Sequence, residues 1–138
     1  MNMASLTLIR HPIQKGVDQA LFRRSLGAEG ERIAADFLRT SGYEIRGRNL
    51  RVGRDEIDIL AFDPVDSVLV FAEVKTRSKR DRDFPAMMGA GFRKCERLRR
   101  SARAWTEAEN FEGGYRLDVL CVEGGDVTEH IKELSWDE

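Results

Sequence analysis

The sequence predicts an α/β fold in which a mixed central β-sheet is flanked by helices. Residues 56–62 and 68–75 are rich in β-branched and aromatic side chains, and the polar segment between them contains Pro64. Two such runs across a short polar break favour a β-hairpin, which is an antiparallel pair. A helical pattern over residues 86–109 connects the second run to another strand-like segment, residues 115–123. This strand–helix–strand unit implies a parallel pair, so the sheet combines both orientations.

The length and charge of the chain favour one globular domain. A chain of 138 residues can bury a core without a disulfide or metal framework. The net charge of −1 argues against a strongly basic nucleic-acid coat, although it leaves room for local basic patches. Cys95 and Cys121 lack the spacing of a zinc site, and no apolar run is long enough to span a membrane. We therefore expect a soluble, cytoplasmic protein.

The N-terminal region shows no sustained hydrophobic period. Residues 1–25 are predicted to be a partly disordered extension, with one turn of helix near residues 17–24, and residues 26–138 to be the single domain. From residue 28 to residue 41 apolar side chains recur at helical spacing, and Gly42 supplies a typical helix stop. Glu31 borders the apolar stripe of this helix. It is either a solvated glutamate near a helix N-terminus or part of a functional site.

The hairpin brings two acidic residues together. Residues 43–52 alternate weakly and are predicted to form a strand that ends at Gly53. If the hairpin loop consists of residues 64–67, then Asp58 lies opposite Glu73, with Cβ atoms roughly 5 Å apart. Opposed carboxylates repel each other, so this arrangement requires a cation.

The second half of the chain is strongly basic in two places. The segment after Lys75 is dense in charge and is predicted to be an exposed loop that carries Arg77, Lys79 and Arg80. The second helix has an apolar stripe that includes Leu98 and Trp105. Its other side carries six basic residues against one acid, Glu96. This excess is typical of phosphate contact, while the simpler interpretation is a solvated helix face. The six residues are Arg93, Lys94, Arg97, Arg99, Arg100 and Arg103.

Two final strands complete the predicted order of helix, three strands, helix and two strands. Residues 115–123 form a continuous apolar run, which begins after Gly113 and Gly114. A turn at residues 124–126 leads into a last short strand near residues 127–134.

The sequence Asp58-x14-Glu73-x-Lys75 is the strongest chemical signal in the chain. Two carboxylates on adjacent strands make a hard-oxygen site suited to Mg²⁺ or Mn²⁺. Lys75 shares a face with Glu73 and could orient an attacking water or neutralise charge on a phosphate, and Glu31 could supply a third carboxylate. The alternative is a surface ion pair of Lys75 with Asp58 or Glu73.

The chain resembles the PD-(D/E)xK nuclease superfamily. More closely, it is similar to the small bacterial YraN-like family of predicted endonucleases, which is related to archaeal Holliday-junction resolvases. The matching residues span about residues 27–123: Gly27-Ala-Glu-Gly-Glu-Arg-Ile-Ala-Ala-Asp-Phe-Leu, Gly42-Tyr43-Glu-Ile, Arg48-Asn49-Leu-Arg51, Glu56-Ile-Asp58-Ile-Leu-Ala, Phe71-Ala-Glu73-Val-Lys75-Thr-Arg77, Lys94 and Arg116-Leu-Asp118. The sequence differs from the family pattern at Asp55 and at Phe84-Pro85, where a glycine is usual.

The resemblance implies a restriction-endonuclease-like fold and a Mg²⁺-dependent endonuclease that acts on DNA, including branched DNA. Its implied metal ligands are Asp58, Glu73 and Glu31, with Lys75 as the catalytic lysine. Arg77, Lys79, Arg80, Lys94 and Arg97 are the expected phosphate contacts. Symmetric cutting of a four-way junction would require two active sites and hence a homodimer. The alternatives are a non-catalytic module that binds nucleic acid or protein, and a purely structural scaffold.

Overall fold

The computed structural model describes residues 15–77 and 90–133, and places side chains for residues 26–77 and 96–133. The elements follow the predicted order of helix, three strands, helix and two strands. They are α2 (Lys15–Thr40), β1 (Glu44–Val52), β2 (Asp55–Asp63), β3 (Val68–Arg77), α3 (Ala90–Ala108), β4 (Tyr115–Glu123) and β5 (Asp126–Ile131).

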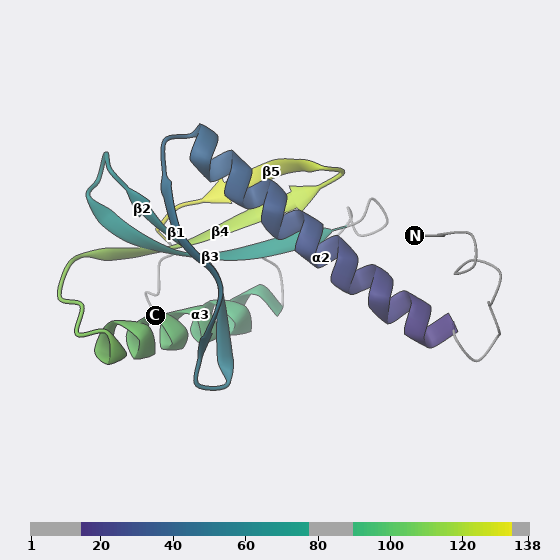
Figure 1. Ribbon diagram of the computed structural model, residues 1–138, viewed down its shortest axis with the longest axis horizontal. Coiled ribbons are helices and arrows are strands. Elements are labelled where there is room, and N and C mark those ends of the chain that lie inside the picture. The colour runs from purple at the N-terminus through teal and green to yellow at the C-terminus, as the bar shows by residue number, and fades with distance from the viewer. Residues whose placement is uncertain (1–14, 78–89, 134–138) are drawn as a thin grey trace, which may run out of the picture.

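The strands form one mixed sheet in the order β1-β2-β3-β4-β5. The β2–β3 pair is antiparallel and the β3–β4 pair is parallel, as the sequence predicts. The β1–β2 and β4–β5 pairs are also antiparallel. The two helices lie on opposite sides of this sheet, α2 on one face and α3 on the other (Figure 1). The predicted α/β class is therefore confirmed, and the architecture is consistent with a restriction-endonuclease-like fold. No helix among the described residues is long and apolar enough to cross a membrane.

Each face of the sheet has its own apolar core. On the α2 face, Ala34, Ala35 and Leu38 pack against β2, β3 and β4. On the α3 face, Leu98 and Ala102 pack against Leu60, Leu69 and Phe71, among others. The alternation of β3 explains this division, because Leu69 and Phe71 point to one side while Val70 and Ala72 point to the other.

The first helix is longer than the sequence predicts at its N-terminal end. It begins at Lys15, whereas the periodic pattern begins only at residue 28. It ends at Thr40 before Gly42, whose φ of +97° is the left-handed conformation expected at a helix stop. Residues 1–14 lie outside the described residues. The charged segment after Arg77 does too, so its prediction as an exposed loop stays a prediction.

The β2–β3 hairpin has the predicted register. Asp63 pairs with Val68, so the loop consists of the four residues 64–67. The Asp63 carboxylate closes this loop, because its Oδ1 atom accepts hydrogen bonds from the backbone N–H groups of Val65 and Asp66 at 2.9 and 3.4 Å.

Arg116 of β4 fixes this loop to the sheet. Its buried guanidinium donates five hydrogen bonds of 2.8–3.0 Å, which satisfy the full donor capacity of an arginine. The acceptors are Asp63 and Asp66 of the loop, both carboxylate oxygens of Asp118, and the Tyr43 hydroxyl. Although burial opposes the charge, the bonds to Asp118 and Asp63 outweigh it and raise the pKa of Arg116.

Asp118 joins the last strand to the same network. It is fully buried, and its carboxylate also meets the His130 ring at 2.8 Å and the backbone N–H of Glu133 at 3.1 Å. Burial alone would raise the pKa of Asp118, but the bonds from His130, Arg116 and Glu133 hold it below its ordinary value. This network therefore connects the β2–β3 loop, β4 and the end of β5.

We predict that Gly30→Ala destabilises the protein by roughly 1–3 kcal/mol, because a Cβ at this position overlaps Thr76 Oγ1 and lies 3.0 Å from Thr76 Cβ. Gly27→Ala is the matched control, since a Cβ there meets nothing within 4 Å. Relief of a helical glycine should stabilise this control by about 0.5–1 kcal/mol. Urea unfolding measures both changes, and equal effects of the two substitutions would contradict the close approach of α2 to β3.

We predict that Arg116→Met lowers the free energy of unfolding by about 3–5 kcal/mol, because it leaves buried carboxylates without their cation. Arg39→Met is the control: its ion pair with Asp36 joins side chains that are 52% exposed, and its loss should cost less than about 1 kcal/mol. Denaturant melts that gave similar values for both variants would show that the network does not stabilise the fold.

Candidate active site at a fork in the sheet

The sheet divides at the level of Asp58 and Glu73. The β2–β3 ladder ends at the pair Ile59↔Ala72. Beyond this pair β2 stays with β1 as far as Val52↔Asp55, while β3 stays with β4 as far as Arg77↔Glu123. The β1–β2 hairpin therefore leaves the plane of the other strands and turns toward α3 (Figure 1).

A backbone irregularity in β1 accompanies this division. Asn49 has a φ of +52°, which is uncommon for a residue with a side chain, and it lies between the pairs Arg48↔Ile59 and Leu50↔Ile57. At the same level of β2 the alternation of side chains changes, because Ile57 packs in the α3 core whereas Ile59 packs in the α2 core. A regular strand would send Ile57 and Ile59 to the same face, so the strict alternation expected of residues 56–62 fails between these two residues.

Asp58 lies inside the fork and accepts a backbone hydrogen bond across it. Its Oδ2 atom lies 2.9 Å from the N–H of Val74, the second residue of β3 beyond the end of the ladder. The register carried one step past Ile59↔Ala72 brings Asp58 level with Glu73, as the sequence predicts. Glu73 is buried, with a side chain that is 7% exposed.

The two carboxylates oppose each other electrostatically. Burial, followed by the negative charge of Glu73, raises the pKa of Asp58 to about 7, although the hydrogen bond from Val74 acts in the opposite direction. The more distant charges of Glu31 and Glu56 contribute to the same rise. The fold therefore destabilises the ionised form of the Asp58 carboxyl relative to the protonated form.

Glu31 reaches the fork from α2. Burial raises the pKa of Glu31, and the charges of Glu56 and Glu73 add to this, while a hydrogen bond with the Asn49 side chain lowers it. The predicted third carboxylate therefore lies close enough to the other acids to feel their charge. Among the described residues, however, no group of three or more His, Cys, Asp and Glu side chains is arranged as it stands to hold a metal ion.

Lys75 lies two residues beyond Glu73 on β3 and is half-buried. It pairs with Cys121 in the parallel ladder. The Cys121 thiol has a pKa raised to about 11, first by burial and then by Glu129, and the positive charge of Lys75 opposes that rise. Lys75 is therefore close enough to the Cys121 thiol on β4 for its charge to act on it.

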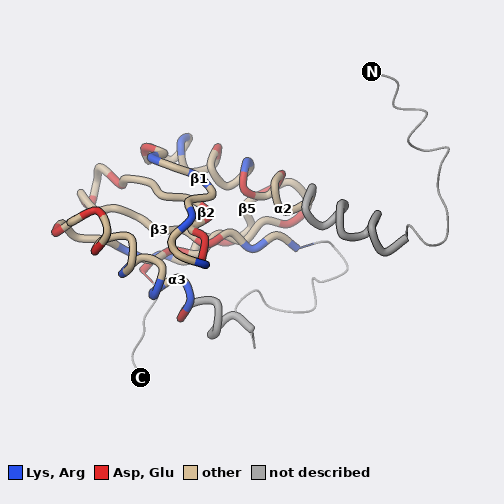
Figure 2. The backbone as a smooth tube through the Cα atoms, turned by 60° about the horizontal axis from the view of Figure 1, so that its bottom comes forward, with Lys and Arg blue, Asp and Glu red and all other residues tan. Residues whose placement is uncertain are grey.

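Of the five predicted phosphate contacts, the structure places two side chains. Arg97 of α3 is at the site, with Nη2 at 3.7 Å from Glu73 Oε2 and 45% of its side chain exposed. Arg77 ends β3, and its Nε atom is buried. Lys79 and Arg80 lie outside the described residues, and Lys94 lies in α3 without a described side chain. Basic positions recur along the described part of α3 (Figure 2).

Asp55, at the start of β2, has a specific partner. Its carboxylate accepts two hydrogen bonds of 3.0 Å from Nε and Nη2 of Arg100 on α3. The hydrogen bonds from Arg100 hold the pKa of Asp55 below its ordinary value. Asp55 thus attaches the end of the β1–β2 hairpin to α3 and does not point at Glu73 or Asp58 as a further ligand.

Sequence reasoning missed two features of the site region. The first is Asn49, whose contact with Glu31 no spacing rule predicts; its place within a strand was the only signal. The second is the pairing of His130 with Asp118. His130 and Asp118 lie on different strands, and no motif in the sequence connects them.

The fold and the site define an α/β protein that gathers acidic residues at a fork in its sheet. Residues 30–122, which include every acid of the fork, match the model of the family described as "Uncharacterised protein family UPF0102". A UPF0102 protein of Streptomyces griseus is 40% identical over 119 residues, which cover 82% of this chain and 98% of the relative. Another, of Prosthecochloris aestuarii, is 37% identical over 129 residues, with 86% and 99% covered. The chain belongs to the UPF0102 family.

We predict that the metal-free protein loses stability between about pH 4 and pH 7. The folded-state pKa of Asp58, about 7, exceeds the ordinary value of 3.8, so the folded state binds a proton that the unfolded state releases. The contribution of this group is fully present below about pH 4 and disappears as the pH rises through 7. Asp58→Asn carries no charge and should be more stable than the wild type at pH 8 by roughly 2–4 kcal/mol.

Urea unfolding in EDTA at pH 5 and pH 8 measures this difference. The difference in the free energy of unfolding between Asp58→Asn and the wild type should be larger at pH 8 than at pH 5. Asp126→Asn serves as the control, because Asp126 is exposed at the start of β5. A gap of the same size at both pH values would show that Asp58 is not held at a raised pKa.

Proposed function

We propose that this protein is a divalent-metal-dependent endonuclease that hydrolyses phosphodiester bonds in DNA. The observation that carries the proposal is the burial of Asp58 against Glu73 at the fork, which raises the pKa of Asp58 to about 7. Two opposed and buried carboxylates are costly unless a cation offsets their charge. Oxygen ligands of this kind suit Mg²⁺ or Mn²⁺.

The resemblance to the PD-(D/E)xK nuclease superfamily supports the same proposal. The residues that carry it, Asp58, Glu73 and Lys75, fall on β2 and β3 on either side of the fork. The mixed sheet with one helix on each face is consistent with the restriction-endonuclease-like fold of that superfamily. Within the proposal Asp58 and Glu73 hold the metal, and Glu31 supports it from α2.

The donor set fits a metal that keeps part of its water shell. Two carboxylates leave coordination positions for water and for a phosphate oxygen, which is the usual arrangement for Mg²⁺ at a phosphate site. A bound metal would supply polarisation of the phosphate and a lowered pKa of its water. Lys75, two residues from Glu73, would stabilise the charge that develops on the phosphate. Arg97 at the site and the basic face of α3 would bind neighbouring phosphates.

A second candidate, a non-catalytic module that binds DNA, is favoured by one contact. Arg97 lies 3.7 Å from Glu73, so a protein cation already offsets part of the negative charge. In that case the acids would be structural, and turnover would be absent. Only the endonuclease proposal calls for a homodimer, because paired cuts in a four-way junction require two active sites.

We predict metal-dependent cleavage of DNA that is lost in Asp58→Ala and Lys75→Ala. The assay uses labelled four-way junction, flap, single-stranded and plain duplex DNA with Mg²⁺, Mn²⁺ or EDTA. Each substitution should reduce the rate by about 100-fold or more, since each removes a group that stabilises charge in the transition state. Asp126→Ala and Lys132→Ala are matched controls at exposed positions and should cleave as the wild type does.

A measurement of metal binding distinguishes the two candidates. Mg²⁺ should raise the Tm of the wild type at pH 8 and leave the Tm of Asp58→Asn unchanged, because a ligand of the folded state stabilises it. An enzyme gives both the Tm shift and cleavage. DNA binding that weakens with salt, without a Tm shift and without cleavage, would reject the nuclease and select the binding module.

A further inference from the structure

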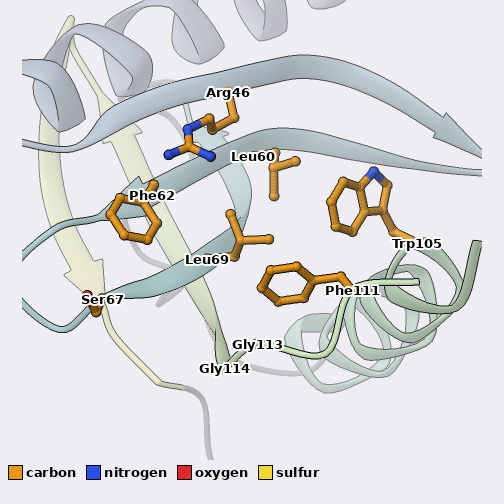
Figure 3. Close-up of a pocket in the computed structure, with 9 residues that line it drawn as sticks. All are labelled: Arg46, Leu60, Phe62, Ser67, Leu69, Trp105, Phe111, Gly113 and Gly114. Carbon is orange, nitrogen blue, oxygen red and sulfur yellow. The ribbon is translucent and has the colours of Figure 1, made fainter. Parts of the chain in front are cut away.

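A cavity of ≈490 Å³ lies on the α3 face of the sheet, away from the acids of the fork. Its floor includes Leu60 of β2 and Leu69 of β3 (Figure 3). Three aromatic rings surround it, Phe62 from the sheet and Trp105 and Phe111 from the end of α3 and the segment that follows (Figure 3). The sequence assigns Trp105 to the apolar stripe of α3, yet the structure leaves part of this ring at the cavity.

Among the residues that the structure describes, one charged side chain lines this cavity, and it is a cation. Arg46 of β1 places its guanidinium 4.9 Å from the centre of the Phe62 ring, at the edge of the cavity (Figure 3). Its ion pair with Glu44, at 3.1 Å, is on the surface, and 48% of the Arg46 side chain is exposed. The lining therefore suits a flat apolar group that carries a negative charge beside it.

The cavity shares strands with the candidate active site. Leu60 lies two residues from Asp58 on β2, and Leu69 lies four residues from Glu73 on β3, which places the cavity about 7–13 Å away. The helix gives the same spacing, because Arg97 meets Glu73 and Trp105 lines the cavity eight residues later, about 12 Å along the axis. At the 3.4 Å rise of a duplex strand this distance corresponds to roughly two to four nucleotides.

We propose that this cavity binds the base of one unpaired nucleotide in a DNA strand, and that Arg46 binds the adjacent phosphate. The inference rests on the proposed function, because the same strand then reaches Asp58 and Glu73. Proteins that bind single strands without sequence preference stack the bases on aromatic rings beside a cation. The lining of this cavity provides both. An apolar side chain of a protein partner would fill the same space, but it would bring no negative group to the Arg46 guanidinium, whose ion pair with Glu44 lies at the surface.

The cavity thereby defines a substrate class. A paired base in an intact duplex cannot enter it without being unstacked, which costs free energy. A base in a flap, a single strand or the branch of a junction is already free to enter. The protein should therefore prefer DNA with an unpaired nucleotide a few positions from the phosphate at the fork.

The test measures binding, not cleavage, by fluorescence anisotropy with Ca²⁺ in place of Mg²⁺, because carboxylate oxygens also bind Ca²⁺. The probes are a labelled flap DNA, the same flap with abasic sites in its unpaired arm, and a plain duplex. The variants are Trp105→Leu, Phe111→Leu and Arg46→Gln, with Phe37→Leu as the control on the α2 face of the sheet. Deoxyadenosine monophosphate, added as competitor, distinguishes a nucleotide within a strand from a free one.

Loss of stacking should weaken flap binding about tenfold in Trp105→Leu and in Phe111→Leu, and leave duplex binding unchanged. The wild type should bind the abasic flap more weakly than the intact flap by the same factor. Trp105→Leu should bind the two flaps equally. Arg46→Gln, at an exposed position, should weaken flap binding a few-fold, and Phe37→Leu should have no effect. Millimolar deoxyadenosine monophosphate should not displace the flap.

Four other results would overturn the inference. Equal losses on flap and duplex DNA would show a general effect of the variants on the fold. Displacement of the flap by the monophosphate would assign the cavity to a free nucleotide. Equal affinity of the wild type for intact and abasic flaps would reject a base in the cavity while leaving DNA binding, and so the proposed function, in place. A wild type that binds none of these DNAs would reject both.

Discussion

The separation of β2 from β3 is the constraint on which the rest of the structure depends. Where the ladder ends at Ile59↔Ala72, the N–H of Val74 loses its strand partner on that side and needs another acceptor. Asp58 provides one at 2.9 Å, and this draws a carboxylate into the fork beside Glu73. The hydrogen bond between Val74 and Asp58 therefore also creates the repulsion between the Asp58 and Glu73 carboxylates.

The opposite face of the sheet keeps that arrangement in register. A slip of one residue in the hairpin would send every side chain of a strand to the other face and would separate Asp58 from Glu73. Arg116 prevents this because it binds Asp63 and Asp66 at the loop and Asp118 on β4. The buried network on the α2 side thus positions acids that lie on the α3 side, without touching them. At the far end of the hairpin, the contact of Asp55 with Arg100 holds the diverging strands against α3.

Local patterns predicted the parts of this protein that depend on neighbours in sequence. The loop at residues 64–67, the strand 115–123 and the alignment of Asp58 with Glu73 follow from a period of two and a polar break, which tertiary contacts did not override. The turn of helix predicted near residues 17–24 lies within α2, but its continuity with the helix from residue 28 escaped prediction because these turns carry no sustained apolar period. The left-handed Asn49, the change of face at Ile57 and the bond between His130 and Asp118 depend on distant segments, which no spacing rule brings together.

The balance of charge at the fork favours the enzyme over the binding module. Arg97 contributes one positive charge at 3.7 Å from Glu73, and its side chain is 45% exposed, so water screens much of its attraction. Asp58, Glu73 and Glu31 together carry three negative charges when ionised. The pKa values of Asp58 and Glu31 stay raised although Arg48 acts on Glu31 and the Val74 N–H donates to Asp58. A module that only bound DNA would place this excess beside the phosphates of its ligand, where like charges repel. A divalent cation reverses the sign of that interaction, because it binds the carboxylates and the phosphate at once. Under the proposed function, a bound metal would let the acids of the fork and the basic face of α3 act on the same DNA ligand.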